Sequence, residues 1–94
     1  KQFIYSLLET ASHDFPDEDP DTEGMSLETL LLFIRKLPPG YRAVFNLFVI
    51  EEKSHKEIAE ILQIQPATSA SQFLRARKLL AEMIREYKHQ MENR

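Results

Sequence analysis

The run Ser54-His55-Lys56-Glu57-Ile58-Ala59-Glu60-Ile61-Leu62, followed by Arg75-Ala76-Arg77-Lys78, decides how this chain is expected to fold. The serine that opens the first run and the glutamate three residues later have capping-box spacing, so a short helix is predicted there. Pro66 suits the first turn of a second helix that continues to about Lys88 or beyond. A short helix, a tight corner and a longer cationic helix have the order of a helix-turn-helix DNA reader. The inward residues of the first helix are predicted to be Ile58, Ile61 and Leu62.

Two further helices are predicted before this unit. One begins at residue 25 or 26, with Ser26 as its N-cap, and ends near Lys36 because Pro38 and Pro39 follow. Its buried face is predicted to hold Leu27, Leu30, Leu31 and Ile34. The other covers residues 40–51. No segment has a convincing strand pattern, so the predicted fold is all-α: a small, winged-helix-like bundle of three or four helices that contains a helix-turn-helix.

Residues 1–24 have a different character from the rest. Apolar side chains recur at helical spacing in residues 2–12, which predicts a short amphipathic helix. Residues 13–24 contain two prolines and six acidic residues, a composition typical of a linker. We therefore divide the chain into residues 1–24, the possible end of a preceding domain, and a helix-turn-helix domain in residues 25–94. Because the sequence begins at Lys1, we expect a fragment of a longer protein.

The composition excludes several classes of protein. The chain has 94 residues, of which 43% are hydrophobic and 29% charged, as expected for one small globular domain. No apolar run approaches the roughly 20 residues of a membrane span, so no membrane insertion is expected. There is no cysteine, which suits a cytoplasmic protein.

The formal net charge of −3 conceals an asymmetry. Residues 1–34 hold one lysine and eight acids, a net charge of −7, whereas residues 35–94 hold eleven lysines and arginines and seven acids, a net charge of +4. A phosphate backbone responds to the local charge, so the second part can bind nucleic acid. The acidic segment could compete with DNA for the basic face, a hypothesis that removal of residues 1–25 would test.

The helical periodicity of residues 66–88 separates two faces. One is predicted to be core and holds Phe73, Ala76, Leu80, Met83, Ile84 and Tyr87. The opposite face holds Ser71, Arg75, Lys78, Glu82 and Arg85. Leu74 lies on the outward side, where a leucine suits contact with a thymine methyl group. Arg77 lies at the edge of the apolar face, so it either contacts DNA or packs its stem and bridges to a neighbouring helix.

These residues together resemble region 4 of the sigma-70 family of bacterial sigma factors, in its extracytoplasmic-function (ECF) group. The matching elements are Leu37-Pro38, Arg42-Ala43-Val44-Phe45 with Leu47, the run from Ser54 to Leu62, Thr68, Ser71 and Arg75-Ala76-Arg77. The resemblance implies a transcription initiation factor that recognises the promoter minus-35 element. It also implies docking on the beta-subunit flap of core RNA polymerase and an anti-sigma factor as a candidate partner.

The sequence departs from the family pattern at several positions that concern DNA. The corner glycine and a serine of the recognition helix are replaced by Gln63 and Gln65, and a frequent glycine by Ala67. Two positions that are often basic in the family are Ala70 and Gln72 here. The Gln72 side-chain amide can still hydrogen-bond to an adenine base. The predicted DNA-binding residues are Ser54, Lys56, Thr68, Ser71, Gln72, Leu74, Arg75, Arg77 and Lys78. Three phosphate contacts, from Arg75, Lys78 and either Lys56 or Arg77, would give a log-log salt slope of about −3.

Two alternatives stay open at this point. A LuxR-type output domain has a similar helix-turn-helix, although Leu37-Pro38 and Arg75-Ala76-Arg77 favour the sigma family. A helical protein-interaction module with a decayed DNA-binding face would explain Ala70 and Gln72.

Catalysis is the poorest interpretation. The three histidines, His13, His55 and His89, form no metal-spaced pair and are predicted to be surface residues, and no nucleophile motif is present. The acidic residues 17–28 have calcium-loop offsets, but Thr22 replaces the required glycine. No catalytic residue, cofactor or metal ligand is therefore predicted.

Overall fold

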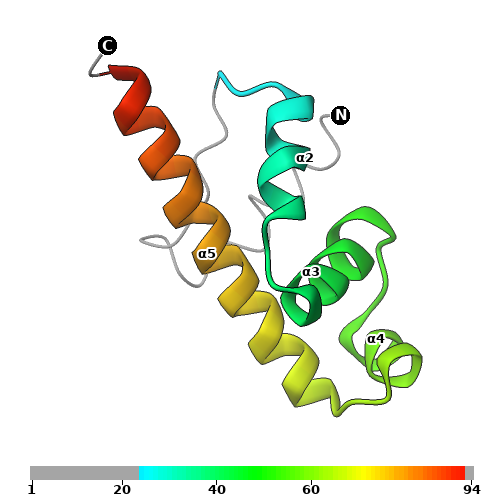
Figure 1. Ribbon diagram of the computed structural model, residues 1–94. Coiled ribbons are helices and arrows are strands. Elements are labelled where there is room, and N and C mark those ends of the chain that lie inside the picture. Colours follow the sequence, from blue (N-terminus) through cyan, green and yellow to red (C-terminus); the bar gives the residue numbers. More distant parts are fainter. Residues whose placement is uncertain (1–23, 93–94) are drawn as a thin grey trace.

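The computed structural model describes residues 24–92, which form four helices and one π-helical turn, with no strand in that range (Figure 1). In chain order these elements are α2 (Leu27–Arg35), α3 (Pro39–Phe45), the π-helical turn η2 (Asn46–Ile50), α4 (His55–Leu62) and α5 (Pro66–Glu92). The all-α prediction is confirmed, and residues 24–92 contain no wing. The predicted helix at 2–12 and the acidic linker as far as residue 23 lie outside the described residues.

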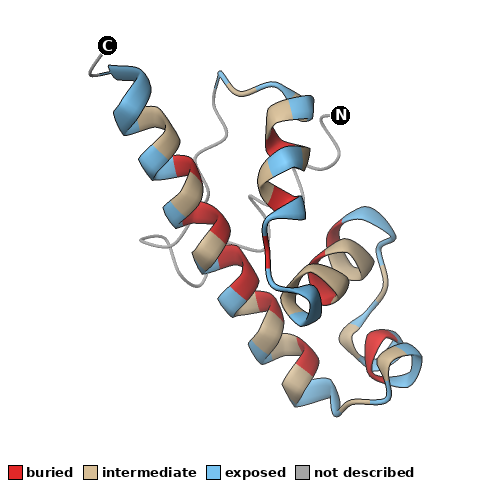
Figure 2. Cartoon of the chain, in the orientation of Figure 1, coloured by how far each residue is buried: buried red, intermediate tan, exposed pale blue. Residues whose placement is uncertain are grey.

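The long helix α5 is the spine of the fold. Its 27 residues span about 40 Å at the usual rise of an α-helix. Helices α3 and α4 pack against its first half and α2 packs against its second half (Figure 1). Figure 2 shows that the buried residues of α5 lie on the side that faces these helices, while exposed residues occupy the other side. The buried hydrophobic cluster consists of Leu30, Ile34, Leu37, Val44, Phe45, Val49, Ile58, Phe73, Ala76, Leu80 and Ile84.

Helix α2 is capped at its N-terminus and is linked to α3 by one arginine. The Ser26 Oγ accepts a hydrogen bond of 3.1 Å from the Thr29 N–H, which confirms the predicted N-cap of α2. At the other end, the Arg42 Nη1 of α3 donates to the carbonyl oxygen of Arg35 at 2.8 Å. Because the last carbonyls of a helix have no intrahelical donor, this bond satisfies one of them and links α2 to α3.

The helix predicted over residues 40–51 is α-helical only as far as Phe45. Its last turn is π-helical, with the Glu51 N–H donating to the Asn46 carbonyl at 3.1 Å. The wider turn leaves Val49 fully buried while Phe48 packs against both His55 and Phe73. Sequence periodicity predicted one regular helix here because it does not register a single wide turn.

The predicted capping box of α4 is confirmed. The Glu57 N–H donates to the Ser54 Oγ at 3.1 Å, and the Ser54 N–H donates to the Glu57 Oε1 at 2.9 Å. The hydrogen bond from the Ser54 backbone N–H, followed by one from the Ser54 side chain, holds the pKa of the Glu57 carboxyl below its ordinary value of 4.5. Ile58 is buried as predicted, but Ile61 points outward with 52% of its surface exposed, which corrects its assignment as an inward residue.

The corner after α4 is built without a glycine. Gln63 takes the left-handed conformation, with φ 59° and ψ 47°, and the Ile64 N–H donates to the Ala59 carbonyl at 3.0 Å. This is the pattern of a Schellman C-cap, which ordinarily uses glycine because other residues are strained there. The chain therefore turns at the position where the family pattern has a glycine, at some conformational cost.

The substitution Gln63→Gly is expected to stabilise the domain by about 0.5–1 kcal/mol, because relief of left-handed strain of roughly 1–2 kcal/mol exceeds the added chain entropy of glycine. Gln63→Val should instead lower the free energy of unfolding, since a β-branched side chain tolerates this conformation worse. Urea unfolding followed by circular dichroism measures both changes. A glycine variant less stable than the original chain would contradict this account of the corner.

Candidate nucleic-acid interface

The two helices of the helix-turn-helix meet at an angle, with their N-termini on the same side of the fold. In Figure 1, α4 is seen nearly along its axis whereas α5 runs across the picture. The start of α4 touches the first turns of α5, because His55 Nδ1 lies 2.9 Å from Ser69 Oγ. This places two helix N-termini, each with unpaired backbone N–H groups, at one end of the domain.

The outer face of α5 is open to solvent where the sequence predicted it. Ser71, Arg75 and Lys78 are all exposed, whereas Phe73 and Ala76 on the same helix are buried. Both cations lie in the first half of α5, close to the turn that connects it to α4. We call Ser71, Arg75 and Lys78 the basic ridge, and its two cations are exposed on the side of α5 away from the core.

Arg77 does not belong to this ridge. Its side chain is fully buried, with 0% of its surface exposed, and it is the largest fully buried side chain in the described part of the chain. A guanidinium enclosed in this way cannot reach a phosphate, so the prediction that Arg77 contacts DNA is corrected. The alternative, in which its stem packs inside the domain, agrees with the observed burial. The basic ridge of α5 therefore has one cation fewer than predicted.

Three predicted residues of α5, Thr68, Gln72 and Leu74, are half-buried. The Gln72 Oε1 lies 3.6 Å from the position that a Cβ on Gly40 would occupy, so this amide leans against the start of α3. A Cβ at position 40 would lie in ordinary van der Waals contact with this amide, so the contact does not require glycine. Ser71 is thus the most accessible of the residues predicted to face base edges, with Leu74 and Gln72 beside it.

The start of α4 offers two further predicted residues, Ser54 and Lys56, and both are exposed. The Ser54 Oγ accepts the Glu57 N–H, and the Ser54 side chain also bonds to the Glu57 carboxyl, so this residue acts first as a cap. Helix geometry leaves the N–H groups of His55 and Lys56 without intrahelical acceptors. An anion placed here would meet these N–H groups, the positive end of the helix and the Lys56 ammonium.

An aromatic cluster that the sequence pattern did not predict lies beneath this surface. The His55 ring stacks on Phe48 with centroids 4.6 Å apart and planes 9° apart, and it lies 6.1 Å from the Phe73 ring. His55 was predicted to be a surface residue, but the structure leaves it half-buried. Burial lowers the pKa of its imidazole below the ordinary 6.5, because the charged form is less well solvated there. No local pattern signals this burial, because the groups that cover His55 come from other elements.

The lowered pKa of His55 predicts acid sensitivity. The unfolded chain takes up the proton more readily, so the stability contributed by neutral His55 is present above pH 6.5 and is lost as the pH falls through the lower folded pKa. Urea midpoints measured at about pH 7.5 and about pH 5.5 should fall more for the original chain than for His55→Phe, which cannot titrate. Equal falls would show that His55 does not contribute.

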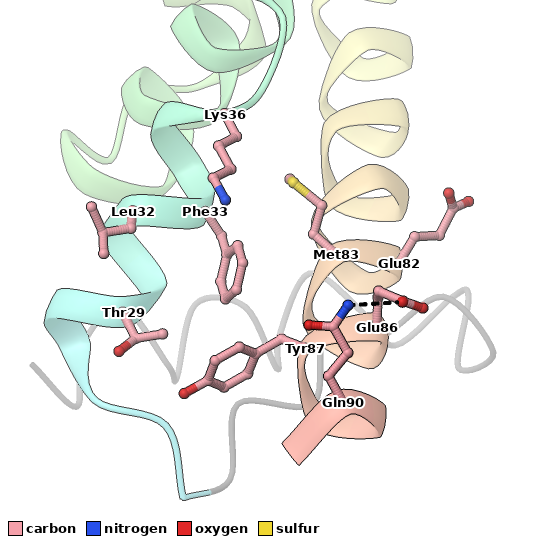
Figure 3. Close-up of a pocket in the computed structure, with 9 residues that line it drawn as sticks. All are labelled: Thr29, Leu32, Phe33, Lys36, Glu82, Met83, Glu86, Tyr87 and Gln90. Carbon is pink, nitrogen blue, oxygen red and sulfur yellow. Dashed lines mark hydrogen bonds between the residues drawn. The ribbon is translucent and has the colours of Figure 1, made fainter. Parts of the chain in front are cut away.

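A second surface feature lies at the other end of α5. A groove of about 720 Å³ separates α2 from the C-terminal half of α5 (Figure 3). Phe33 and Tyr87 meet edge to face across it with ring centroids 5.3 Å apart, and Leu32 beside them is 54% exposed. Lys36 stands on the α2 side, with its Nζ 5.3 Å from the Phe33 ring centre. The lining residues are Thr29, Leu32, Phe33, Lys36, Glu82, Met83, Glu86, Tyr87 and Gln90.

Neither membrane spans nor metal clusters were found in the part of the chain that the structure describes. No helix in residues 24–92 is long and apolar enough to cross a bilayer. The same residues contain no group of three or more histidine, aspartate or glutamate side chains placed to hold a metal ion.

A capped short helix that meets a long helix with a cationic outer face places this domain in the class of helix-turn-helix DNA-binding proteins. A comparison with protein families matches residues 27–80 to the family described as Sigma-70, region 4. This match covers more than half of the chain, so the chain belongs to that family. Its role is therefore that of a DNA-binding sigma-factor domain in transcription. Searches of curated proteins and of solved structures found no match.

Proposed function

We propose that this chain is region 4 of an ECF-group sigma factor and recognises the promoter minus-35 element through the outer face of α5. One observation carries the proposal: the family match over residues 27–80 contains the whole of α4 and the exposed Ser71, Arg75 and Lys78 of α5. A role in transcription initiation places its action on bacterial chromosomal DNA, in the cytoplasm. No catalytic step is proposed, because the proposed role of the domain is to position promoter DNA relative to RNA polymerase.

The proposed contacts divide between phosphates and bases. An α-helix fits the major groove, so the first half of α5 would lie there with Ser71 and Leu74 toward base edges. Arg75 and Lys78 on α5, with Lys56 at the start of α4, would each neutralise a phosphate. Because Arg77 is buried, Lys56 is the third cation, and the expected log-log salt slope remains about −3.

Three phosphate contacts give weak electrostatic binding for a free domain, so the proposed function requires a tether. We assign the polymerase contact to the groove between α2 and α5, with the beta-subunit flap as its occupant. The groove presents an apolar centre with Lys36 on one wall and Glu82 and Glu86 on the other, which suits an amphipathic helix. It lies beside α2, away from the N-termini of α4 and α5, so polymerase and DNA could bind together. Tethering would raise the effective concentration of the domain at the promoter.

The groove assignment predicts that Leu32→Asn weakens binding to core RNA polymerase by about tenfold or more, because burying a leucine side chain contributes roughly 1.5–3 kcal/mol. DNA binding should not change. Ile61→Asn is the matched control, since Ile61 on α4 is 52% exposed and Leu32 is 54% exposed, and neither change alters charge. Biolayer interferometry with immobilised polymerase measures both variants. Equal affinities for the two variants would remove the groove from the proposal.

The function as a whole is tested by a pull-down with core RNA polymerase, followed by footprinting of the bound genomic DNA. Protection centred on a minus-35 element supports the proposal. Capture of polymerase without such protection would leave an interaction module whose DNA-binding face has decayed. Retention of neither partner would overturn the proposed function entirely.

A further inference from the structure

A hydrogen bond joins the beginnings of α4 and α5 inside the domain. The Ser69 side chain is fully buried in the first turns of α5, and its Oγ lies 2.9 Å from the Nδ1 of His55, the first residue of α4. The imidazole is held from its face by Phe48, at 4.6 Å between ring centres. One part-buried polar bond thus lies beside aromatic rings, next to the proposed DNA-binding surface.

We infer that His55 and Ser69 are positioning residues for DNA recognition, and that their hydrogen bond sets the orientation of α5 relative to α4. The inference rests on the proposed function. It adds that affinity for DNA depends on two side chains that do not themselves contact it. Neither residue belongs to the exposed ridge formed by Ser71, Arg75 and Lys78.

The chemistry of the contact explains why this bond, more than the surrounding packing, would set the orientation. Stacked rings tolerate sliding, since favourable pairs occur over centroid separations of about 4.5–7 Å. A hydrogen bond weakens steeply outside a narrow range of length and angle. A buried serine hydroxyl without a partner is also costly, which disfavours arrangements in which α4 has shifted along α5. The rings therefore supply contact, and the hydrogen bond selects one geometry.

The distance along α5 magnifies a small change at this point. Lys78 lies nine residues after Ser69, about 14 Å along the helix. A tilt of about 15° about Ser69 would move the backbone at Lys78 by roughly 3.5 Å, more than the length of a hydrogen bond. A shift of that size would separate the cations of α5 from phosphates that the start of α4 still holds. Affinity would fall although every contacting side chain remained in place.

Two substitutions of His55 separate the bond from the stack. His55→Phe keeps an aromatic ring against Phe48 but cannot bond to Ser69, whereas His55→Asn keeps a polar group near the position of Nδ1 and loses the ring. We expect His55→Phe to lower the melting temperature, because the buried Ser69 hydroxyl loses its partner, and to bind minus-35 DNA about three- to tenfold more weakly. We expect His55→Asn to have a lower melting temperature than the original chain. Its affinity for DNA should stay within about twofold of the original, because a twofold change corresponds to less free energy than one hydrogen bond contributes. Ser69→Ala should weaken DNA binding like His55→Phe.

The measurements are fluorescence anisotropy with labelled promoter DNA, well below the melting temperature, and thermal unfolding of the same full chains. If His55 and Ser69 only stabilised the fold, their substitution would lower the melting temperature and leave the dissociation constant for DNA unchanged. Affinities of His55→Phe and Ser69→Ala equal to that of the original chain would therefore overturn the inference. Weaker binding by His55→Asn than by His55→Phe would also overturn it. Failure of the proposed function is distinguishable, because Arg75→Ala with Lys78→Ala would then leave DNA binding intact.

Discussion

Replacing Arg75 and Lys78 together by alanine is expected to weaken binding to minus-35 DNA by about 60-fold at 0.1 M salt. Each phosphate contact contributes about 0.9 logarithmic units of affinity per tenfold decrease in salt, and the variant loses two such contacts. Both side chains are exposed on the outer face of α5, so their truncation should not disturb the core. The log-log salt slope should fall from about −3 to about −1, because only the Lys56 contact remains. Polymerase binding should be unchanged, as the groove beside α2 is formed by other residues.

Fluorescence anisotropy titrations at several salt concentrations measure both the affinity and the slope. The matched control is Arg35→Ala with Arg85→Ala, which removes the same charge from two other exposed positions, on α2 and further along α5. If the control weakened binding as strongly, the effect would reflect net charge and not a placed contact. If neither double variant changed DNA binding, Arg75 and Lys78 would not be the DNA contacts and the proposed DNA-binding face would be wrong.

The second large effect is expected in the core. Phe45→Ala should destabilise the domain by about 3–5 kcal/mol, the usual cost of truncating a buried phenylalanine. Phe45 has 0% of its surface exposed and stacks on Phe73 with ring centres 5.9 Å apart, so its removal opens a cavity between α3 and α5. Small domains have a free energy of unfolding of only about 5–15 kcal/mol, and the melting temperature should fall by roughly 15–30 °C.

Urea unfolding followed by circular dichroism tests this prediction. The midpoint should fall while the dependence on urea concentration stays the same, as expected for a loss of stability without a change of the unfolded state. Phe33→Ala is the control, because Phe33 is only half-buried at the groove beside Tyr87 and should cost clearly less. Equal losses for Phe33 and Phe45 would contradict the assignment of the core.

Features that depend on neighbours in the sequence were predictable. The caps at Ser26 and Ser54 are formed by residues three positions apart, and such spacing is visible in a sequence. The division of α5 into a buried and an exposed face follows from the helical period, which is why the positions of Ser71, Arg75 and Lys78 were anticipated. The sigma region 4 resemblance, now confirmed, rested on the same local runs.

Features that depend on tertiary packing were not predictable in this way. Arg77 lies at the edge of the apolar face, where periodicity alone does not decide between solvent and core, and the neighbouring helices bury it completely. Ile61 had an inward position in the period, but 52% of its surface is exposed, so the packing of α4 leaves that side of the helix open to solvent. The bond between His55 and Ser69 joins residues fourteen positions apart, a separation that no local pattern encodes.

The unbroken course of α5 carries the basic ridge and one wall of the groove on a single helix. Tyr87 lies twelve positions after Arg75, about 18 Å along a rigid helix. A partner seated beside Tyr87 would therefore dictate both how far away and at what rotation Arg75 meets the duplex. Adding one residue within this stretch would turn the two surfaces by about 100° relative to each other. The geometry of α5 would then set the spacing between the two bound partners. This stretch of the helix should tolerate substitutions, but it should tolerate few insertions or deletions of residues.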